Sequence, residues 1–272
     1  MACTVFAIFI LIASLCASSC TKINNTHAND SGTFYFHLHT QIIDSTIGGN
    51  TDGADSNATG PGASPWYKDG KGRLIELLVP QFFISNIKLA NANGTMLTLK
   101  NVVLLKGLDS EVYYLCKVPV GTYTSATFTV GLANSDSSVA PGTLFLTDGI
   151  PFPTESTMWN GSSYYGMKIT GAYDTTATGT GINPIPFIFN IPNGLTIASA
   201  NQVSLPTRGT GAYASYRVYV LTAGGTQYVH ILCDYGKLLS SINLKTSNQT
   251  AVNPLIADTL ASNISSMFRY EE

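Results

Sequence analysis

The stretch TFYFHLHTQII, residues 33–43, decides the fold class of this chain. Its side chains fall into two alternating sets: Phe34, Phe36 and Leu38 in one, and Tyr35, His37 and His39 in the other. A repeat of two residues is typical of a β-strand that buries one face. The stretch therefore predicts a half-buried strand with two histidines on the face opposite the core.

Working outward, similar segments recur along the chain between turn signals such as Asn93-Gly94 and Gly224-Gly225. The further predicted strands are Leu74–Leu89, Met96–Leu105, Glu111–Val118, Thr122–Gly131, Ser163–Tyr173, Pro186–Ile191, Leu195–Leu205, Tyr216–Thr222 and Gln227–Cys233. Many short strands with frequent turns favour a sandwich or barrel over alternating strands and helices.

One helix is predicted at the C-terminal end. Asn253 can cap it and Pro254 suits its first position. Its apolar stripe consists of Ile256, Leu260, Ile264 and Met267. We therefore expect an all-β fold: a single β-sandwich-like domain over residues 33–272 with a short C-terminal helix.

Composition excludes several classes of protein. Only 11% of the 272 residues are charged, and the formal net charge is -2. This argues against a coiled coil, a helical bundle and a disordered chain. No run of Lys or Arg occurs, so we expect no nucleic acid as a partner.

The N-terminal residues have the pattern of a targeting signal. Residues 5–17 form an apolar run that is too short to span a bilayer. The small residues before Cys20 resemble a bacterial lipobox, which predicts a signal peptide over residues 1–19, a lipid on Cys20 and a polar tether over residues 20–32. We then expect a membrane anchor at the cell envelope, on the outer membrane, facing the periplasm or the cell surface. The alternative is ordinary secretion with Cys20 as a spare thiol.

The two cysteines of the folded part, Cys116 and Cys233, lie in apolar strand-like runs. They could form one disulfide in an oxidising compartment, or remain two buried free thiols. Their spacing matches no metal or redox motif.

His37 and His39 are the sharpest local feature. Side chains at i and i+2 of a strand project from one face, roughly 6–7 Å apart. Neutral imidazole suits copper or zinc, so the pair is a candidate metal site that needs a third ligand. The alternative is two solvated rings on an edge strand. His230 is interpreted as a hydrogen-bonded core or face histidine rather than a ligand.

The sequence offers little support for a calcium site or for a catalytic site. Asp44, Asp52 and Asp55 could offer oxygen ligands to calcium, but aspartates in Gly- and Asn-rich loops usually serve turn geometry. No nucleophile elbow and no phosphate-binding glycine loop occurs. The expectation is that the protein is not an enzyme.

Several segments occur in an order that resembles one family. They are FISNIKL at 83–89, Asn93-Gly94, VPVGTY at 118–123, FTVGL at 128–132, MWNG at 158–161 and DYGKLL at 234–239. In this order they resemble the copper-binding MbnP-like domain, over nearly the whole mature chain. The chain departs from the family pattern at Ala133, which replaces an acid, and at Asn190, which replaces a histidine.

The resemblance implies a secreted or outer-membrane β-sandwich that binds copper, beside a dihaem peroxidase-like partner that oxidises a tryptophan in some members. Trp159 falls at or next to a family tryptophan, and the thioether of Met158 could join a Cu(I) site. The alternative is that Trp159 and Met158 pack together.

Two functions follow. The first is a cell-envelope lipoprotein that handles copper through His37 and His39, with Trp159 or Met158 nearby. The second is a metal-free surface binding or adhesin-like structural module, in which tyrosines such as Tyr164, Tyr173 and Tyr213 stack on sugars.

Overall fold

The computed structural model describes residues 30–42, 45–46, 67–68, 73–99, 102–106, 111–132, 137–141, 146–147, 150–151, 156–176, 184–196, 202–206, 218–251 and 253–270. The predictions for the signal peptide, for Cys20, for the aspartates of the long loop and for Tyr213 lie outside these residues.

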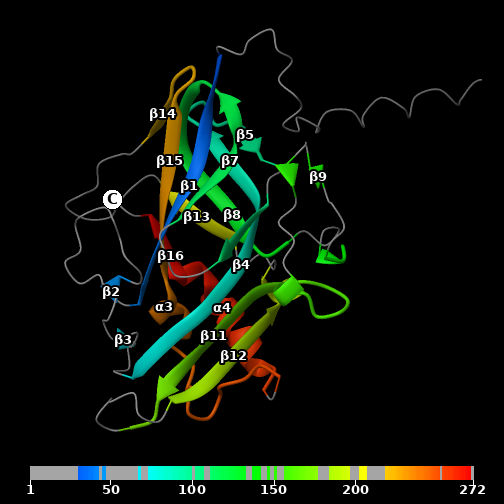
Figure 1. Cartoon of the computed structure of the whole chain (residues 1–272). Coiled ribbons are helices and arrows are strands. Elements are labelled where there is room, and N and C mark those ends of the chain that lie inside the picture. Colours follow the sequence, from blue (N-terminus) through cyan, green and yellow to red (C-terminus); the bar gives the residue numbers. More distant parts are fainter. Residues whose placement is uncertain are drawn as a thin grey trace, which may run out of the picture.

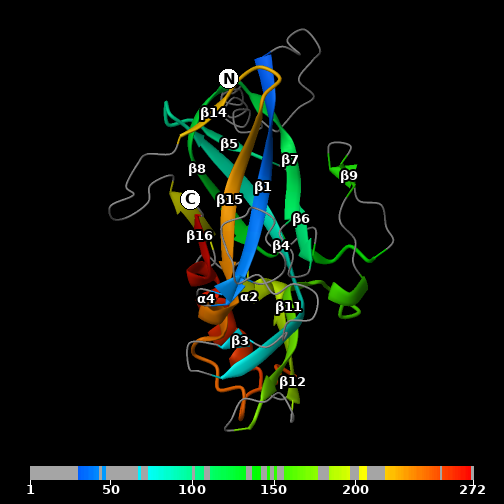
Figure 2. The same cartoon turned by 60° about the vertical axis from the view of Figure 1, so that its left-hand side comes forward.

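Strand β1 (Ser31–Ile42) is the centre of the first sheet. It pairs in parallel with β15 (Thr226–Asp234) and, on its other side, antiparallel with β7 (Glu111–Pro119). Two short strands, β2 (Ser45–Thr46) and β16 (Phe268–Tyr270), complete this sheet. β1 and β15 run side by side in both cartoon views (Figures 1 and 2).

The second sheet is built around β4 (Leu74–Asn91). Its strand order is β12 (Pro184–Pro192), β11 (Tyr165–Asp174), β4, β8 (Gly121–Val130) and β13 (Gln202–Pro206). β14 (Tyr219–Leu221) pairs with β8, whereas β3 (Tyr67–Lys68), β5 (Met96–Thr98) and β6 (Val103–Lys106) pair with β4. A separate small hairpin consists of β9 (Leu146–Thr147) and β10 (Ile150–Pro151).

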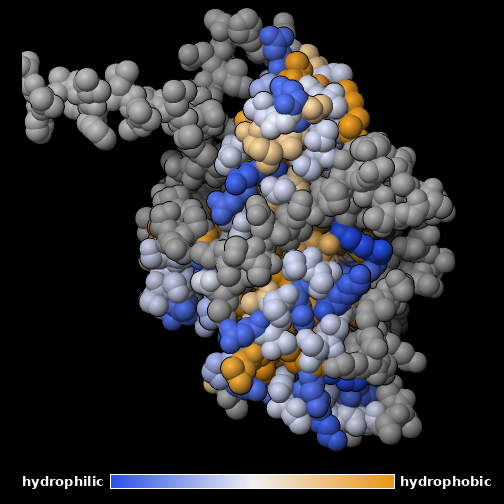
Figure 3. All heavy atoms as spheres, turned by 180° about the vertical axis from the view of Figure 1, so that it is seen from behind, coloured by the Kyte–Doolittle hydropathy of each residue, from blue (hydrophilic) through white to orange (hydrophobic). Residues whose placement is uncertain are grey.

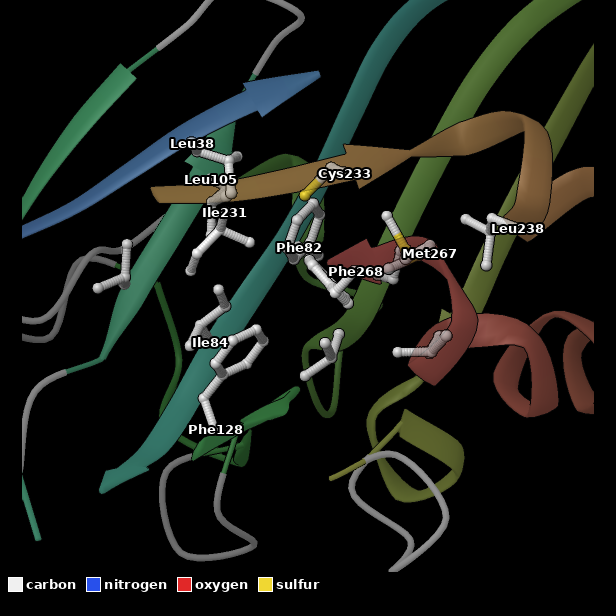
Figure 4. Packing of buried hydrophobic residues seen from close by; sticks show 14 of the residues in the cluster. Leu38, Phe82, Ile84, Leu105, Phe128, Ile231, Cys233, Leu238, Met267 and Phe268 are labelled. Atoms are coloured by element: carbon white, nitrogen blue, oxygen red, sulfur yellow. The ribbon is translucent and has the colours of Figure 1, made fainter. Parts of the chain in front are cut away.

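The core lies between these two sheets, and aromatic side chains cross it. Phe36 of β1 contacts Phe128 of β8 with ring centroids 5.6 Å apart, and Phe34 contacts Tyr123 at 5.2 Å. Figure 4 shows side chains of both sheets and of α4 meeting in this core, among them Cys233. The predicted all-β, sandwich-like fold is confirmed.

The predicted C-terminal helix is α4 (Leu255–Met267). The N-cap of this helix is Pro254 rather than the predicted Asn253, although the Asn253 side chain accepts a hydrogen bond from the Leu255 N–H at 3.2 Å. The predicted stripe is buried: Ile256, Leu260, Ile264 and Met267. Two shorter helices, α2 (Asn193–Thr196) and α3 (Tyr235–Leu239), and a 3-10 turn, η2 (Ser156–Met158), were not predicted.

Two predicted strands differ from the structure. The segment predicted as one strand over Met96–Leu105 is divided into β5 and β6, which pair with different parts of β4. Between those parts lies Asn86, whose φ of 51° interrupts the extended backbone of β4. The predicted strand over Leu195–Leu205 begins instead within α2, and its last described part forms β13.

Figure 3 shows that apolar areas on the face opposite the view of Figure 1 are interrupted by polar residues. In the part of the chain that the structure describes, no helix combines the length and apolar character needed to cross a membrane.

Candidate metal centre

The parallel pairing of β1 with β15 brings three histidines together. His37 is the register partner of His230, and His39 is the partner of Leu232. Partners in a parallel ladder point to the same side of a sheet. Since the neighbours Phe36 and Leu38 face the core, all three histidines lie on the outer face of the first sheet.

The three rings converge closely. Their centroids are 4.2 Å apart for His37 and His39, 4.7 Å for His37 and His230, and 5.9 Å for His39 and His230. One ring nitrogen from each lies within 4.8 Å of the other two. Two nitrogens bound at ~2 Å to one ion are at most ~4 Å apart, so closing the site needs a movement of ~1 Å or less. We call these residues the histidine cluster.

Burial differs within the histidine cluster. His39 has only 3% of its surface exposed, whereas His37 and His230 are partly exposed. Among the described residues this is the one group of three histidine, cysteine or acidic side chains with such spacing. The set offers three neutral nitrogen donors, which copper and zinc both accept.

A polar network closes one end of the histidine cluster. It begins at Gln41, two residues after His39 on the same face of the sheet. The Gln41 Nε2 donates to Asp234 Oδ2 at 3.0 Å, and the Arg269 guanidinium donates to Gln41 Oε1 at 3.2 Å. The other Asp234 oxygen caps α3 by accepting the Lys237 N–H at 3.2 Å. These bonds tie β1, β15, β16 and α3 together, and so hold the register that aligns His37 with His230.

Tyrosines border the other end of the cluster. Tyr35 and Tyr228 are register partners and stack with centroids 5.4 Å apart. Tyr228 also lies 6.3 Å from the His37 ring and 6.4 Å from the His230 ring. Tyr114 of β7 contacts Tyr35 edge-on at 5.7 Å. The outer face of β1 and β15 thus changes from tyrosine to histidine to a charged network along the strands.

Met158 and Trp159 do not join the histidines. They belong to a small cluster with Phe83, Leu104 and Tyr164, in which the Trp159 and Tyr164 rings are 5.0 Å apart. Phe83 faces away from the core, because its neighbours on β4 face into it. Met158 and Trp159 therefore lie on the outer face of the second sheet, with the whole sandwich between them and the histidine cluster. Met158 and Trp159 therefore pack within this small cluster, as the alternative interpretation of the sequence predicted.

The structure also decides between the alternatives for the cysteines. Cys116 and Cys233 are both free and buried. Cys116 is aligned with Phe34 of β1 and Cys233 with Thr40, a separation of six residues or about 20 Å along the strand. Bridged cysteines need Cα atoms within about 7 Å, so strand register prevents a disulfide. Burial, and secondarily the Asp234 carboxylate, raise the pKa of the Cys233 thiol well above its usual value.

Two of the three tyrosines proposed to stack on sugars, Tyr164 and Tyr173, cannot do so. Tyr164 is fully buried and Tyr173 is 3% exposed, because both pack into the second sheet. Among the tyrosines whose burial the structure describes, Tyr114 and Tyr228 are exposed, at 45% and 39%.

The sequence interpretation missed His230 as a member of the cluster. A signal was present: residues 35–38 read YFHL and residues 228–231 read YVHI, the same order of aromatic, apolar, histidine and apolar residues. In the parallel pair these two segments lie in register. Nothing local to either segment indicates that they are neighbours.

Comparison with known proteins adds the family. The family model MbnP matches residues 68–255 of the chain. The chain belongs to the MbnP family. The match includes His230, Met158 and Trp159, but it begins after β1 and therefore leaves out His37 and His39.

Among solved structures, MbnP from Methylosinus trichosporium is similar to this chain at 11% sequence identity. The similarity covers 78% of this chain and 79% of that one, with a TM-score of 0.45. No curated protein matches the chain.

Proposed function

We propose that this MbnP-family protein binds one copper ion at the histidine cluster and serves in copper handling rather than in catalysis. The observation that carries the proposal is the convergence of three imidazoles from two adjacent strands, with one nitrogen of each within 4.8 Å of the others. The resemblance of the chain to a copper-binding family supports copper over other metals that accept imidazole. Met158 and Trp159 have no part in this site.

The test is a titration of the full-length protein with Cu(I) and Cu(II) in competition with chelators, with bound metal counted by native mass spectrometry. We expect one copper per chain. His37→Ala, His39→Ala and His230→Ala should each weaken binding at least about tenfold, because each removes one of three donors.

The chain supplies its own control. It has four histidines, and the fourth, His27, is not one of the three that define the histidine cluster. The variant His27→Ala should bind copper as the unaltered protein does. Equal losses in all four variants, or binding that survives His230→Ala, would contradict a site at the cluster.

We also propose that residues 1–19 are removed and that Cys20 carries the lipid anchor of an outer-membrane protein. The lipobox-like residues before Cys20 support this proposal. Cys20→Ala should abolish labelling by a palmitate analogue and release the protein from membranes. Unchanged labelling and fractionation would indicate ordinary secretion.

The resemblance further suggests a dihaem peroxidase-like partner that acts on a tryptophan. Trp159 is partly exposed, which supports it as the residue that such a partner would reach. Peroxide treatment in the presence of the partner should change the mass of the peptide that contains Trp159, and not that of a Trp159→Phe variant.

A further inference from the structure

We propose that the metal at the histidine cluster keeps one coordination position for a small exogenous anion, and that Tyr228 limits the size of this ligand. This inference rests on the proposed function, since it needs a metal bound at the cluster. It assigns to the site a ligand class and a residue that selects for size.

The donor count is the first step. The cluster offers three nitrogens, and among the described residues no acidic or cysteine side chain joins it. Cu(I) is satisfied by few ligands, but Cu(II) and Zn(II) usually take four or more. A divalent ion held here would therefore lack at least one ligand from the described residues.

Charge is the second step. Three neutral imidazoles leave the two positive charges of a divalent ion uncompensated. The nearby carboxylate of Asp234 is committed to Gln41 and to the N-terminus of α3. An anionic ligand is therefore favoured over a neutral one of the same size.

The direction of approach is the third step. His39 is 3% exposed, and beyond it the end of the cluster is closed by the network of Gln41, Asp234 and Arg269. His37 and His230 are partly exposed and lie toward the tyrosine end. An external ligand would then approach past these two rings.

Tyr228 stands at this approach. Its ring meets those of His37 and His230 edge-on at nearly equal distances, 6.3 and 6.4 Å. Stacking on Tyr35 at 5.4 Å and an interplanar angle of 25° holds the ring in place. Because Tyr228 borders both partly exposed histidines, its side chain narrows the space beside the fourth position and favours donors of few atoms.

The test uses the full-length protein loaded with one Cu(II), with azide as the small anion and imidazole as the larger donor. Azide should bind once per copper and produce a new ligand-to-metal charge-transfer band. Tyr228→Ala should raise the affinity for imidazole relative to azide about tenfold or more, whereas Tyr228→Phe should change it little, because the ring and not the hydroxyl fills the space.

Tyr114→Ala is the matched control. Tyr114 is a similarly exposed tyrosine of the same sheet. It lies on β7 and its ring contacts that of Tyr35, whereas Tyr228 contacts the histidine rings. This variant should leave the ratio of the two affinities unchanged.

Three results would overturn the inference. Copper bound once per chain without any azide-dependent change would mean that the position is already filled, and would leave the proposed function intact. A phenolate-to-copper band that disappears in Tyr228→Phe would make Tyr228 itself the fourth ligand. Absence of stoichiometric copper would overturn both this inference and the proposed function.

Discussion

At the scale of single residues, the histidine cluster depends on which face of a strand each side chain occupies. Alternation along β1 predicted correctly that Phe34, Phe36 and Leu38 would be buried. It placed His37 and His39 together on the other face, as the structure does. The same logic applied to β15 separates His230 from its buried neighbours Val229 and Ile231. What it could not supply was the pairing of two strands far apart in the sequence.

Cys233 gives a prediction about pH. Its pKa is raised in the folded protein by burial, so the unfolded chain loses this proton first as the pH rises. Below the unfolded pKa of about 8.5 the group has no effect on stability, and above it the free energy of unfolding falls by up to about 1.4 kcal/mol per pH unit. Urea unfolding between pH 7 and pH 10 should show this loss, and the free energy of unfolding should fall less steeply with pH in Cys233→Ala than in the unaltered protein. An equal pH dependence in the two proteins would contradict a buried Cys233 thiol.

At the scale of elements, side-chain hydrogen bonds to the backbone and close packing at a glycine position the strands and helices around the core. The Asn193 side chain clamps the backbone of Leu132: its Oδ1 accepts the Leu132 N–H at 2.6 Å and its Nδ2 donates to the Leu132 carbonyl at 2.8 Å. Asn193 is the first residue of α2, and the last two residues of this helix, 195 and 196, were predicted as the start of a strand. The contact joins positions 61 residues apart, so local apolar periodicity carries no sign of it.

Asn193→Ala should therefore be costly. It leaves two buried backbone groups of Leu132 without these partners, at about 1–3 kcal/mol each, so we expect a loss of about 2–6 kcal/mol in the free energy of unfolding. Asn243→Ala is the matched control, because Asn243 is exposed and its side chain accepts only the Lys245 N–H at 3.2 Å in a turn. This control should lose less than about 1 kcal/mol. Similar urea midpoints for both variants would refute the clamp.

A glycine shows how tightly β4, β11 and β12 pack. A Cβ atom at Gly171 of β11 would collide with the Glu76 carbonyl oxygen and with the ring of Phe187. Gly171→Ala should destabilise the protein by about 1–3 kcal/mol or more, since one of the colliding atoms belongs to the backbone. At Gly194 a Cβ would meet no atom within 4 Å, so Gly194→Ala should be tolerated. Thermal unfolding of the two variants compares them directly, and a stable Gly171→Ala would contradict the packing.

At the scale of the whole molecule, the sandwich separates two outer faces with different composition. One carries the histidine cluster and its tyrosines, and the other carries Met158 and Trp159. Composition, turn signals and alternation predicted the all-β class and the C-terminal helix. They could not place Met158 and Trp159, because the side of the sandwich that a loop reaches depends on the order of strands in the sheets.

The central claim is that copper lies between His37, His39 and His230. The most direct measurement is a crystal structure of the copper-loaded full-length protein, with anomalous difference density recorded at the copper absorption edge. We predict one peak, about 2 Å from one nitrogen of each of the three imidazoles. A peak beside Met158 and Trp159, or no ordered copper at the histidine cluster, would contradict the account.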